Sequence, residues 1–296
     1  MSDTLIDRLF LGAGAMKAGT TWLYAVLSRH PEIHFSYEKE VHYFYARAVR
    51  SDVLSDRARL RNVEQKYLRF DPERTNPAAL RARFRWIANY LDNPVDDHWY
   101  RMLCTALPDG AWAADFSNLY ALLPSSEWRR IRSKVGELRV IYTLRDPVER
   151  LWSHAKFHLR ITGQADAIAQ WPPERMEAFV RQPFIWENAE YGAALRRMRD
   201  ALPEDALRVI VHEALHGDER AGLAEIEAFL GIAHQDYPED LRSRRVNPTS
   251  AEPVPPAFRA RVQRDVDRIL AELRSEGIAL PPGWGAPGTS PEQEVA

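Results

Sequence analysis

The residues with the clearest chemical potential in this chain lie between Gly12 and Trp22. A short apolar run precedes them and apolar residues at helical spacing follow, which predicts a strand, a glycine-containing turn and a helix in succession. Such a turn directs backbone N–H groups and the positive end of a helix toward an anion. We therefore predict a site for a phosphate-like group, with an ordinary tight turn as the alternative. The binding residues predicted from this stretch are Lys17, Ala18, Gly19, Thr20, Thr21 and Trp22.

The spacing of the two glycines, Gly14 and Gly19, is that of a nucleoside triphosphate-binding loop. However, Thr20 stands where such a loop has its lysine, and the lysine is at position 17 instead. A nucleoside triphosphate needs that lysine at its β- and γ-phosphates and a hydroxyl on magnesium. The loop therefore favours another phosphate-bearing ligand. A magnesium-dependent small-molecule kinase is the alternative.

A second candidate site follows the most strand-like segment of the chain. Asp146 suits a helix N-cap, Pro147 suits the first helical position, and Glu149 has the spacing of a capping box. A helix is thus predicted to begin here, with Arg145 at the strand tip and Ser153 two turns along. Together these two side chains offer a guanidinium and a hydroxyl to one phosphate. The alternative is a plain helix start with Arg145 in a surface ion pair.

A carboxylate and an imidazole, Glu40 and His42, follow the apolar segment 33–35. Either group could take a proton from a substrate hydroxyl held near the predicted phosphate loop. The residue types do not decide which of the two is the base. The alternative is a charged loop in which His42 packs beside Tyr43 and Phe44.

These three segments jointly resemble the sulfotransferase family, whose donor is 3′-phosphoadenosine-5′-phosphosulfate (PAPS). Residues 16–22 are similar to the family's 5′-phosphosulfate loop, and Arg145 with Ser153 is similar to its 3′-phosphate element. Residues 39–44 resemble a stretch of the heparan-sulfate and related carbohydrate branch, in which the glutamate is the general base. The resemblance extends over residues 8–232.

The resemblance implies in-line transfer of a sulfuryl group from PAPS to a hydroxyl or amine of a carbohydrate or small molecule. Glu40 would be the base, with His42 as the competing candidate, and Lys17 would neutralise the departing phosphate. Arg244 and Arg245, in a late basic run, would close over the nucleotide. The sequence shows no cluster of metal ligands, so we expect transfer without a metal.

The chain departs from the carbohydrate branch at residues 115–120, Asp-Phe-Ser-Asn-Leu-Tyr. That branch has a lysine where Phe116 stands and a proline where Asn118 stands. The departure predicts that a second cation is missing and leaves the acceptor class open. A nucleotide-binding module without catalytic activity is a further alternative.

The order of elements predicts an α/β fold: a P-loop-like central parallel sheet flanked by helices, with a helical insertion. Ligands of such sheets bind beyond the carboxyl ends of the strands. We expect one domain over residues 1–280, an insertion over about 46–110 and a flexible tail over 281–296. The predicted strands are Leu9–Ala13, Ile33–Phe35, Trp112–Phe116, Leu138–Leu144 and Leu207–His212.

Composition limits the other possibilities. The net charge of −2 gives no global indication of nucleic-acid binding. A single cysteine, Cys104, excludes an intrachain disulfide. The polar start and the lack of an apolar run long enough to span a bilayer predict a cytoplasmic protein without a membrane contact. Residues 46–90 hold eleven Lys and Arg against five Asp and Glu, which is either a solvated helix surface or a basic wall for an anionic or carbohydrate acceptor.

Overall fold

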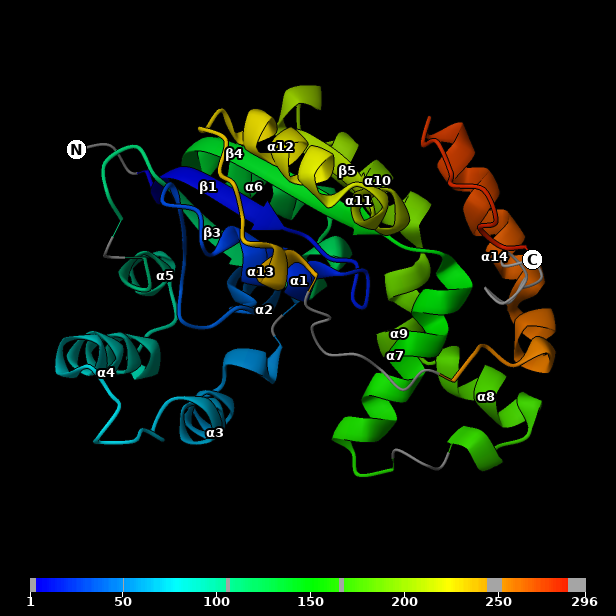
Figure 1. Ribbon diagram of the computed structural model, residues 1–296, viewed down its shortest axis with the longest axis horizontal. Helices are drawn as coiled ribbons and strands as arrows, with labels where there is room; N and C mark the ends of the chain where they lie inside the picture. The colour runs from blue at the N-terminus through cyan, green and yellow to red at the C-terminus, as the bar shows by residue number, and fades with distance from the viewer. Residues whose placement is uncertain (1–3, 50, 105–106, 165–167, 244–251, 287–296) are drawn as a thin grey trace.

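A parallel sheet forms the centre of the protein. The computed structural model describes residues 4–49, 51–104, 107–164, 168–243 and 252–286. Within these residues five strands pair in the order β2-β3-β1-β4-β5, and every pair is parallel (Figure 1). The sheet confirms the predicted α/β class and all five predicted strands. The strands are β1 (Ile6–Gly12), β2 (Ile33–Phe35), β3 (Trp112–Phe116), β4 (Val135–Leu144) and β5 (Leu207–Val211).

Both faces of the sheet are buried, as expected for parallel strands connected by helices. In β1, Phe10 points to one face, and its neighbours Leu9 and Leu11 point to the other. The Phe10 face is covered by α1 (Thr20–Leu27), α11 (His212–Gly217) and α12 (Glu219–Leu230). α12 ends at Gly231, whose φ of 64° is the left-handed conformation that glycine readily adopts at a helix C-terminus.

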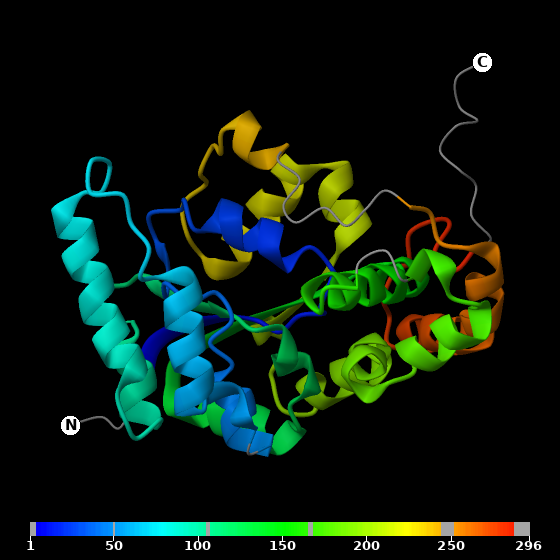
Figure 2. The same ribbon diagram turned by 90° about the horizontal axis from the view of Figure 1, so that it is seen from below.

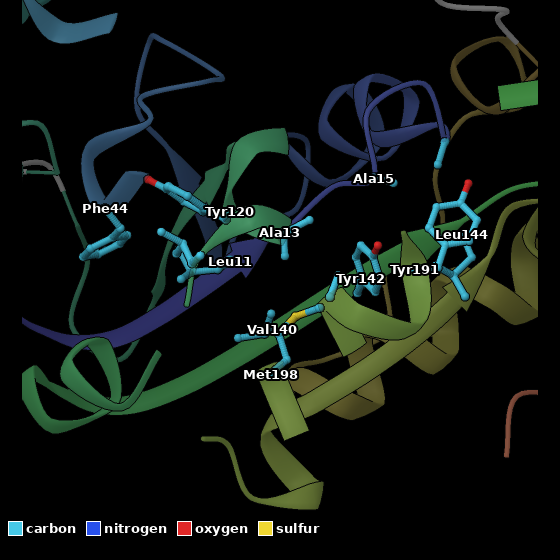
Figure 3. Close-up of a cluster of buried hydrophobic side chains, with 14 of the residues drawn as sticks. Leu11, Ala13, Ala15, Phe44, Tyr120, Val140, Tyr142, Leu144, Tyr191 and Met198 are labelled. Atoms are coloured by element: carbon cyan, nitrogen blue, oxygen red, sulfur yellow. The ribbon is translucent and has the colours of Figure 1, made fainter. Parts of the chain in front are cut away.

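The opposite face carries the larger hydrophobic cluster. Figure 3 shows Val140 and Tyr142 of β4 lying toward Met198 and Tyr191 of α10 (Tyr191–Arg199). Alternating apolar residues on β4 therefore fix α10 against the sheet. Further helices on this side of the sheet and at its end are α6 (Ser125–Lys134), α7 (Pro147–Ile161), α8 (Pro173–Val180), α9 (Pro183–Trp186) and α14 (Pro256–Ser275).

The predicted helical insertion lies between β2 and β3, and α14 lies at the other end of the molecule (Figures 1 and 2). Buried Arg59 holds the insertion together: it donates to the carbonyls of Tyr90 and Asp92, both at 2.7 Å, and to Asn93 Oδ1 at 2.7 Å. This cation of the basic segment is thus structural. The insertion's helices are α2 (Tyr43–Val49), α3 (Asp56–Lys66), α4 (Pro77–Leu91) and α5 (Asp97–Met102).

The chain after α14 folds back onto the helix that follows β4. Trp284 is buried, and the N–H of Gly285 donates to Asp146 Oδ2 at 2.8 Å. Residues 281–286 of the predicted tail therefore contact the domain, and residues 287–296 lie outside the described part of the chain. None of the described helices has the length and apolar character needed to cross a membrane.

Candidate active site

The strand order brings the predicted loops to one edge of the sheet. β1 lies between β3 and β4, so the chain leaves β1 in one direction to form β2 and β3 and returns to the other side to form β4. In such sheets the carboxyl ends beside the reversal point form the ligand crevice. The loops after β1, β2, β3 and β4 all open at this edge, which is where the sequence placed its candidate residues.

The loop from Gly14 to Gly19 is fixed to the end of β4. The N–H of Ala15 donates to the Thr143 carbonyl, and the N–H of Thr143 donates to the Gly14 carbonyl, both at 2.8 Å. Gly19 is the N-cap of α1, with φ 87° and no capping side chain. The first turn of α1 therefore presents N–H groups that no side chain caps, and this is the usual arrangement for binding an anion.

The same loop leaves no room for a side chain at Gly19. A Cβ there would lie 2.6 Å from Nδ1 of His212, a partly buried residue at the start of α11. Because Gly19→Ala adds this clash to an unfavourable positive φ, we expect it to cost about 1–3 kcal/mol more than Gly163→Ala. Gly163 is the matched control, since its φ is 73° and a Cβ added there would meet no atom within 4 Å. Chemical denaturation measures the loss of stability in both variants. Equal losses would show that His212 does not closely approach Gly19.

Lys17 lies among cations. Its Nζ sits 4.6 Å from the centre of the Phe157 ring, on α7. Burial, together with the smaller effects of the positive charges of Arg160, Arg145, Lys156 and Lys39, lowers the pKa of Lys17 to about 8. No ion pair between Lys17 and a carboxylate occurs among the described residues. An anion bound here would relieve this repulsion.

Arg145 reaches the same loop from the tip of β4. Its Nη1 donates to the Lys17 carbonyl at 3.4 Å, and its own carbonyl accepts from the Tyr191 hydroxyl at 3.0 Å. The two predicted phosphate-binding elements therefore lie next to each other. Ser153 is buried on α7, whose face also carries Lys156 and Arg160 near Lys17.

The helix that starts after Arg145 has the predicted N-cap but not the predicted capping box. Asp146 Oδ1 accepts from the N–H groups of Val148 and Glu149, which confirms Asp146 as the N-cap. The predicted capping box is wrong, because the N–H of Asp146 donates to Glu213 Oε1 at 3.1 Å instead of to Glu149. Glu149 pairs with Arg259 of α14 at 3.2 Å. A residue distant in sequence thus replaces the local one.

Glu40 and His42 lie together after β2. Glu40 Oε1 accepts from Lys39 Nζ at 2.9 Å and from Asn118 Nδ2 at 3.1 Å, and Oε2 lies 3.6 Å from His42 Nε2. Burial alone would raise the pKa of Glu40, but the nearby charges of Lys39 and His42 and their hydrogen bonds lower it to about 2. Lys39 Nζ also lies 3.5 Å from Thr20 Oγ1 in the phosphate loop. The predicted base candidates therefore face the predicted anion site.

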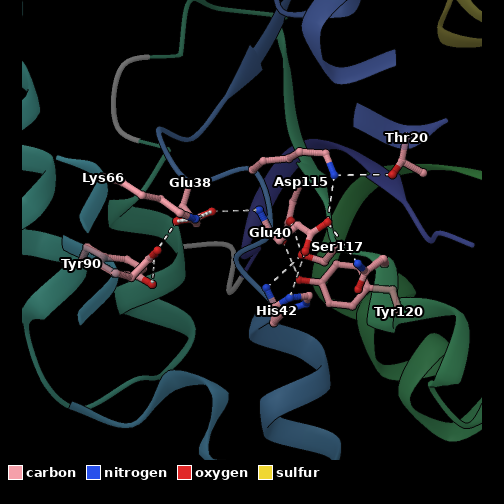
Figure 4. Close-up of polar contacts among 12 residues, drawn as sticks. Thr20, Glu38, Glu40, His42, Lys66, Tyr90, Asp115, Ser117 and Tyr120 are labelled. Atoms are coloured by element: carbon pink, nitrogen blue, oxygen red, sulfur yellow. Dashed lines mark hydrogen bonds and ion pairs between the residues drawn. The ribbon is translucent and has the colours of Figure 1, made fainter. Parts of the chain in front are cut away.

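A buried network holds His42 in place (Figure 4). The N–H of His42, a residue with φ 59°, donates to Ser117 Oγ at 2.9 Å, and Ser117 donates to Asp115 at 2.6 Å. The hydroxyl of Tyr120 also donates to Asp115 at 2.6 Å. Burial raises the pKa of Asp115 against the effect of these donors. The end of β3 thus fixes the backbone of the loop that carries both base candidates.

The insertion is tied to this loop through Glu38. This buried carboxylate accepts from Lys66 Nζ at 3.0 Å and from the Tyr67 hydroxyl at 3.0 Å, and it also contacts Asn62. Glu38 lies two residues before Glu40. The helices of the insertion therefore position the site as well as adding surface beside it.

The other predicted residues take different positions. Ala18 is buried in the larger hydrophobic cluster. Trp22 of α1 is buried in the core, and its Nε1 donates to the Arg242 carbonyl at 2.7 Å. Arg244 and Arg245 lie outside the described residues. The sequence prediction missed Lys39, Lys156 and Arg160; the first is adjacent to Glu40, and the others follow Ser153 at helical spacing.

Phe116 explains the departure in the β3 motif. Its ring is buried on the α1 face of the sheet, 5.2 Å from the ring of Phe10 and 5.0 Å from that of Phe35. The position therefore supplies no charge to the site. Across the described ranges, no group of three or more His, Cys, Asp or Glu residues has the arrangement of a metal site.

Comparison with known proteins gives the family. The model of the sulfotransferase family matches residues 10–236, so this chain belongs to the sulfotransferase family. No match was found among curated proteins.

Solved structures with a similar fold are sulfotransferases. A sulfotransferase from Alicyclobacillus acidocaldarius is 20% identical, with a TM-score of 0.61 over 94% of this chain and 98% of that one. The sulfotransferase domain from the curacin biosynthetic pathway is 16% identical, with a TM-score of 0.55 over 93% and 99%. The sulfotransferase domain from the Synechococcus PCC 7002 olefin synthase is 14% identical, with a TM-score of 0.53 over 94% and 97%. At these identities the likeness concerns the fold.

Proposed function

We propose that the protein transfers a sulfuryl group from PAPS to a hydroxyl of a carbohydrate or small-molecule acceptor. One observation carries the proposal: Arg145, Lys156 and Arg160 surround Lys17 in the loop that leads to the uncapped start of α1, and no carboxylate pairs with Lys17 among the described residues. Such a site favours a ligand with more than one negative charge. PAPS has a 5′-phosphosulfate and a 3′-phosphate, and these two anionic ends suit the two adjacent elements.

Each element has its own part in binding the donor. The loop N–H groups and Lys17 bind the 5′ end, and Arg145 with buried Ser153 binds the 3′-phosphate. The proximity of Arg145 Nη1 to the Lys17 carbonyl, 3.4 Å, supports one nucleotide spanning both elements. Lys17 is a point charge that can follow the charge that develops on the departing phosphate oxygen.

The loop after β2 supplies the base. Glu40 has one-third of its side chain exposed, whereas Glu38 two positions earlier is nearly buried and held by Lys66. Of these two carboxylates, Glu40 is therefore the one accessible to an acceptor hydroxyl. Its carboxylate is ionised at neutral pH and faces the phosphate loop through Lys39. In this proposal Glu40 takes the acceptor proton, and His42 remains the competing base.

The positive charge of the insertion, beside this loop, is the basis for the proposed acceptor. Exposed arginines on α3, on α4 and between them give the insertion a positive surface, and Arg59 and Lys66 have structural partners. The remaining charge supports an anionic acceptor of the kind used by the heparan-sulfate and related carbohydrate branch. The exposed arginines are Arg57, Arg61, Arg69, Arg74, Arg81 and Arg85.

Thermal shift with three nucleotides tests the donor. We expect 3′-phosphoadenosine-5′-phosphate (PAP) to raise the melting temperature, because a ligand at a hundred times its Kd adds about 2.7 kcal/mol. Adenosine monophosphate should give a smaller shift, since it lacks the 3′-phosphate. Arg145→Met should remove the difference between the two, whereas Arg129→Met, which loses only a surface pair with Asp200, should keep it. A response to ATP with magnesium and none to PAP would instead indicate a kinase.

A further inference from the structure

We infer that Lys39 is a second catalytic cation, which binds the sulfuryl group during its transfer. This inference rests on the proposed function and adds a residue that the sequence motifs did not indicate. The ammonium of Lys39 lies between two groups with separate roles in that function. It is 3.5 Å from Thr20 Oγ1 of the phosphate loop and 2.9 Å from Glu40 Oε1.

The position between these groups decides the role of Lys39. In-line transfer places the acceptor oxygen, the sulfur and the leaving oxygen in one row. The leaving oxygen belongs to the group bound by the phosphate loop, and the acceptor oxygen lies at its base, Glu40. The sulfuryl oxygens must therefore lie between the loop and Glu40, which is the region that Lys39 Nζ occupies.

The other side chains facing this region make Lys39 necessary. The end of β3 supplies no cation here: it contributes the neutral amide of Asn118, whereas Asp115 and Phe116 are buried away from this region. Lys17 belongs to the leaving phosphate and repels Lys39. The charged and titratable groups described around Glu40 are thus Lys39 and His42 of its own loop and Glu38, whose Oε1 accepts from the Glu40 N–H at 3.5 Å, with Asp115 behind His42 and Lys17 across from Lys39.

The site also indicates how Lys39 changes partner. Without donor its ammonium pairs with Glu40, and only 14% of the Lys39 side chain is exposed. A bound sulfuryl group offers anionic oxygens beside Thr20, to which the flexible lysine stem can turn. Glu40 then loses its cation and becomes a stronger base, because the charge of Lys39 is the largest of the effects that lower its pKa.

The bonds in the transfer step balance without another reactant. The acceptor oxygen forms a bond to sulfur as the bond from sulfur to the 5′-phosphate oxygen breaks. The electron pair of the broken bond stays on that phosphate oxygen, facing Lys17, and the acceptor proton passes to Glu40. Lys39 stabilises the sulfuryl oxygens while both bonds are partial.

Lys39→Met tests this role. We expect turnover with PAPS to fall 10²- to 10³-fold at every pH from 6 to 9. The affinity for PAP should change only a few-fold, because PAP has no sulfuryl group. Lys39→Arg should recover part of the loss. The control is Arg129→Met, which removes a cation from a surface pair with Asp200 outside the site and should leave turnover within a few-fold of wild type.

Other results would overturn the inference. If Lys39 only lowered the pKa of Glu40, Lys39→Met would retain near-normal turnover at pH 7, since Glu40 would still be ionised there. An equal loss of PAP affinity and turnover would make Lys39 a phosphate-binding residue. A wild-type protein that does not bind PAP would refute the proposed function itself.

A double variant serves if Lys39→Met does not fold. Lys39→Met combined with Glu40→Gln removes both charges of the pair, so no carboxylate is left without its cation. Its turnover is compared with that of Glu40→Gln alone. An additional loss of at least tenfold supports a direct role for Lys39, and no additional loss contradicts it.

Discussion

Lys17→Met is expected to lower turnover 10²- to 10³-fold and at the same time to raise the melting temperature. The loss of turnover follows from the loss of the cation at the departing phosphate. The gain in stability follows from the surroundings of Lys17, where burial and four nearby cations lower its pKa to about 8. Methionine keeps the length of the side chain and its contact with Phe157.

The stability gained in Lys17→Met should depend on pH, and this dependence tests its cause. The unfolded chain holds the Lys17 proton with the ordinary pKa of 10.5, more tightly than the folded chain does. A protonated Lys17 therefore lowers the free energy of unfolding fully below pH 8, and this penalty disappears as pH rises from 8 to above 10.5. The melting-temperature difference between Lys17→Met and wild type should be a few degrees at pH 7 and smaller at pH 10.

Calorimetry at the two pH values measures this difference, and other titrating groups largely cancel because they are common to both proteins. A variant that is less stable at pH 7 would contradict the account of Lys17 as a strained cation. Near-normal turnover would remove Lys17 from the catalytic site. The expected combination of lost activity and gained stability is typical of a residue that serves ligand binding rather than folding.

The sequence predicted the parts of this site that depend on local signals. The glycine turn before α1, the Asp146 cap and the short apolar segments of the strands are short-range patterns, and the structure has each of them. The gathering of the four loops at one edge follows from the parallel order of the strands. For this reason Glu40 and Arg145, distant in sequence, could both be assigned to one site.

The other features of the site depend on how helices and loops pack against one another. Glu213 replaces Glu149 as the partner of the Asp146 N–H because α11 packs beside the start of α7, and no local spacing indicates this. Lys156 and Arg160 approach Lys17 only through the orientation of α7. The sequence alone gives Lys39 no role, since only the folded chain brings its ammonium to 3.5 Å from Thr20 in the phosphate loop.

Glu40→Gln and His42→Asn, compared side by side, should identify the base. Glutamine retains an oxygen for Lys39 and Asn118 but cannot take up a proton, so we expect turnover to fall 10²- to 10⁴-fold with PAP affinity unchanged. Asparagine suits position 42 because it tolerates the positive φ of 59°, whereas alanine would add backbone strain. It also keeps the backbone N–H that donates to Ser117. We expect His42→Asn to cause the smaller loss.

The reason for preferring Glu40 is geometric as well as electrostatic. Its Oε1 is engaged by Lys39 and Asn118, which orients the carboxylate and leaves Oε2 facing His42 and the acceptor side of the loop. His42 has its backbone fixed by Ser117 and its Nε2 directed at that same oxygen, so its position suits orienting Glu40. Steady-state rates at saturating PAPS decide between them. If His42→Asn abolishes turnover and Glu40→Gln does not, the imidazole is the base and Glu40 orients it.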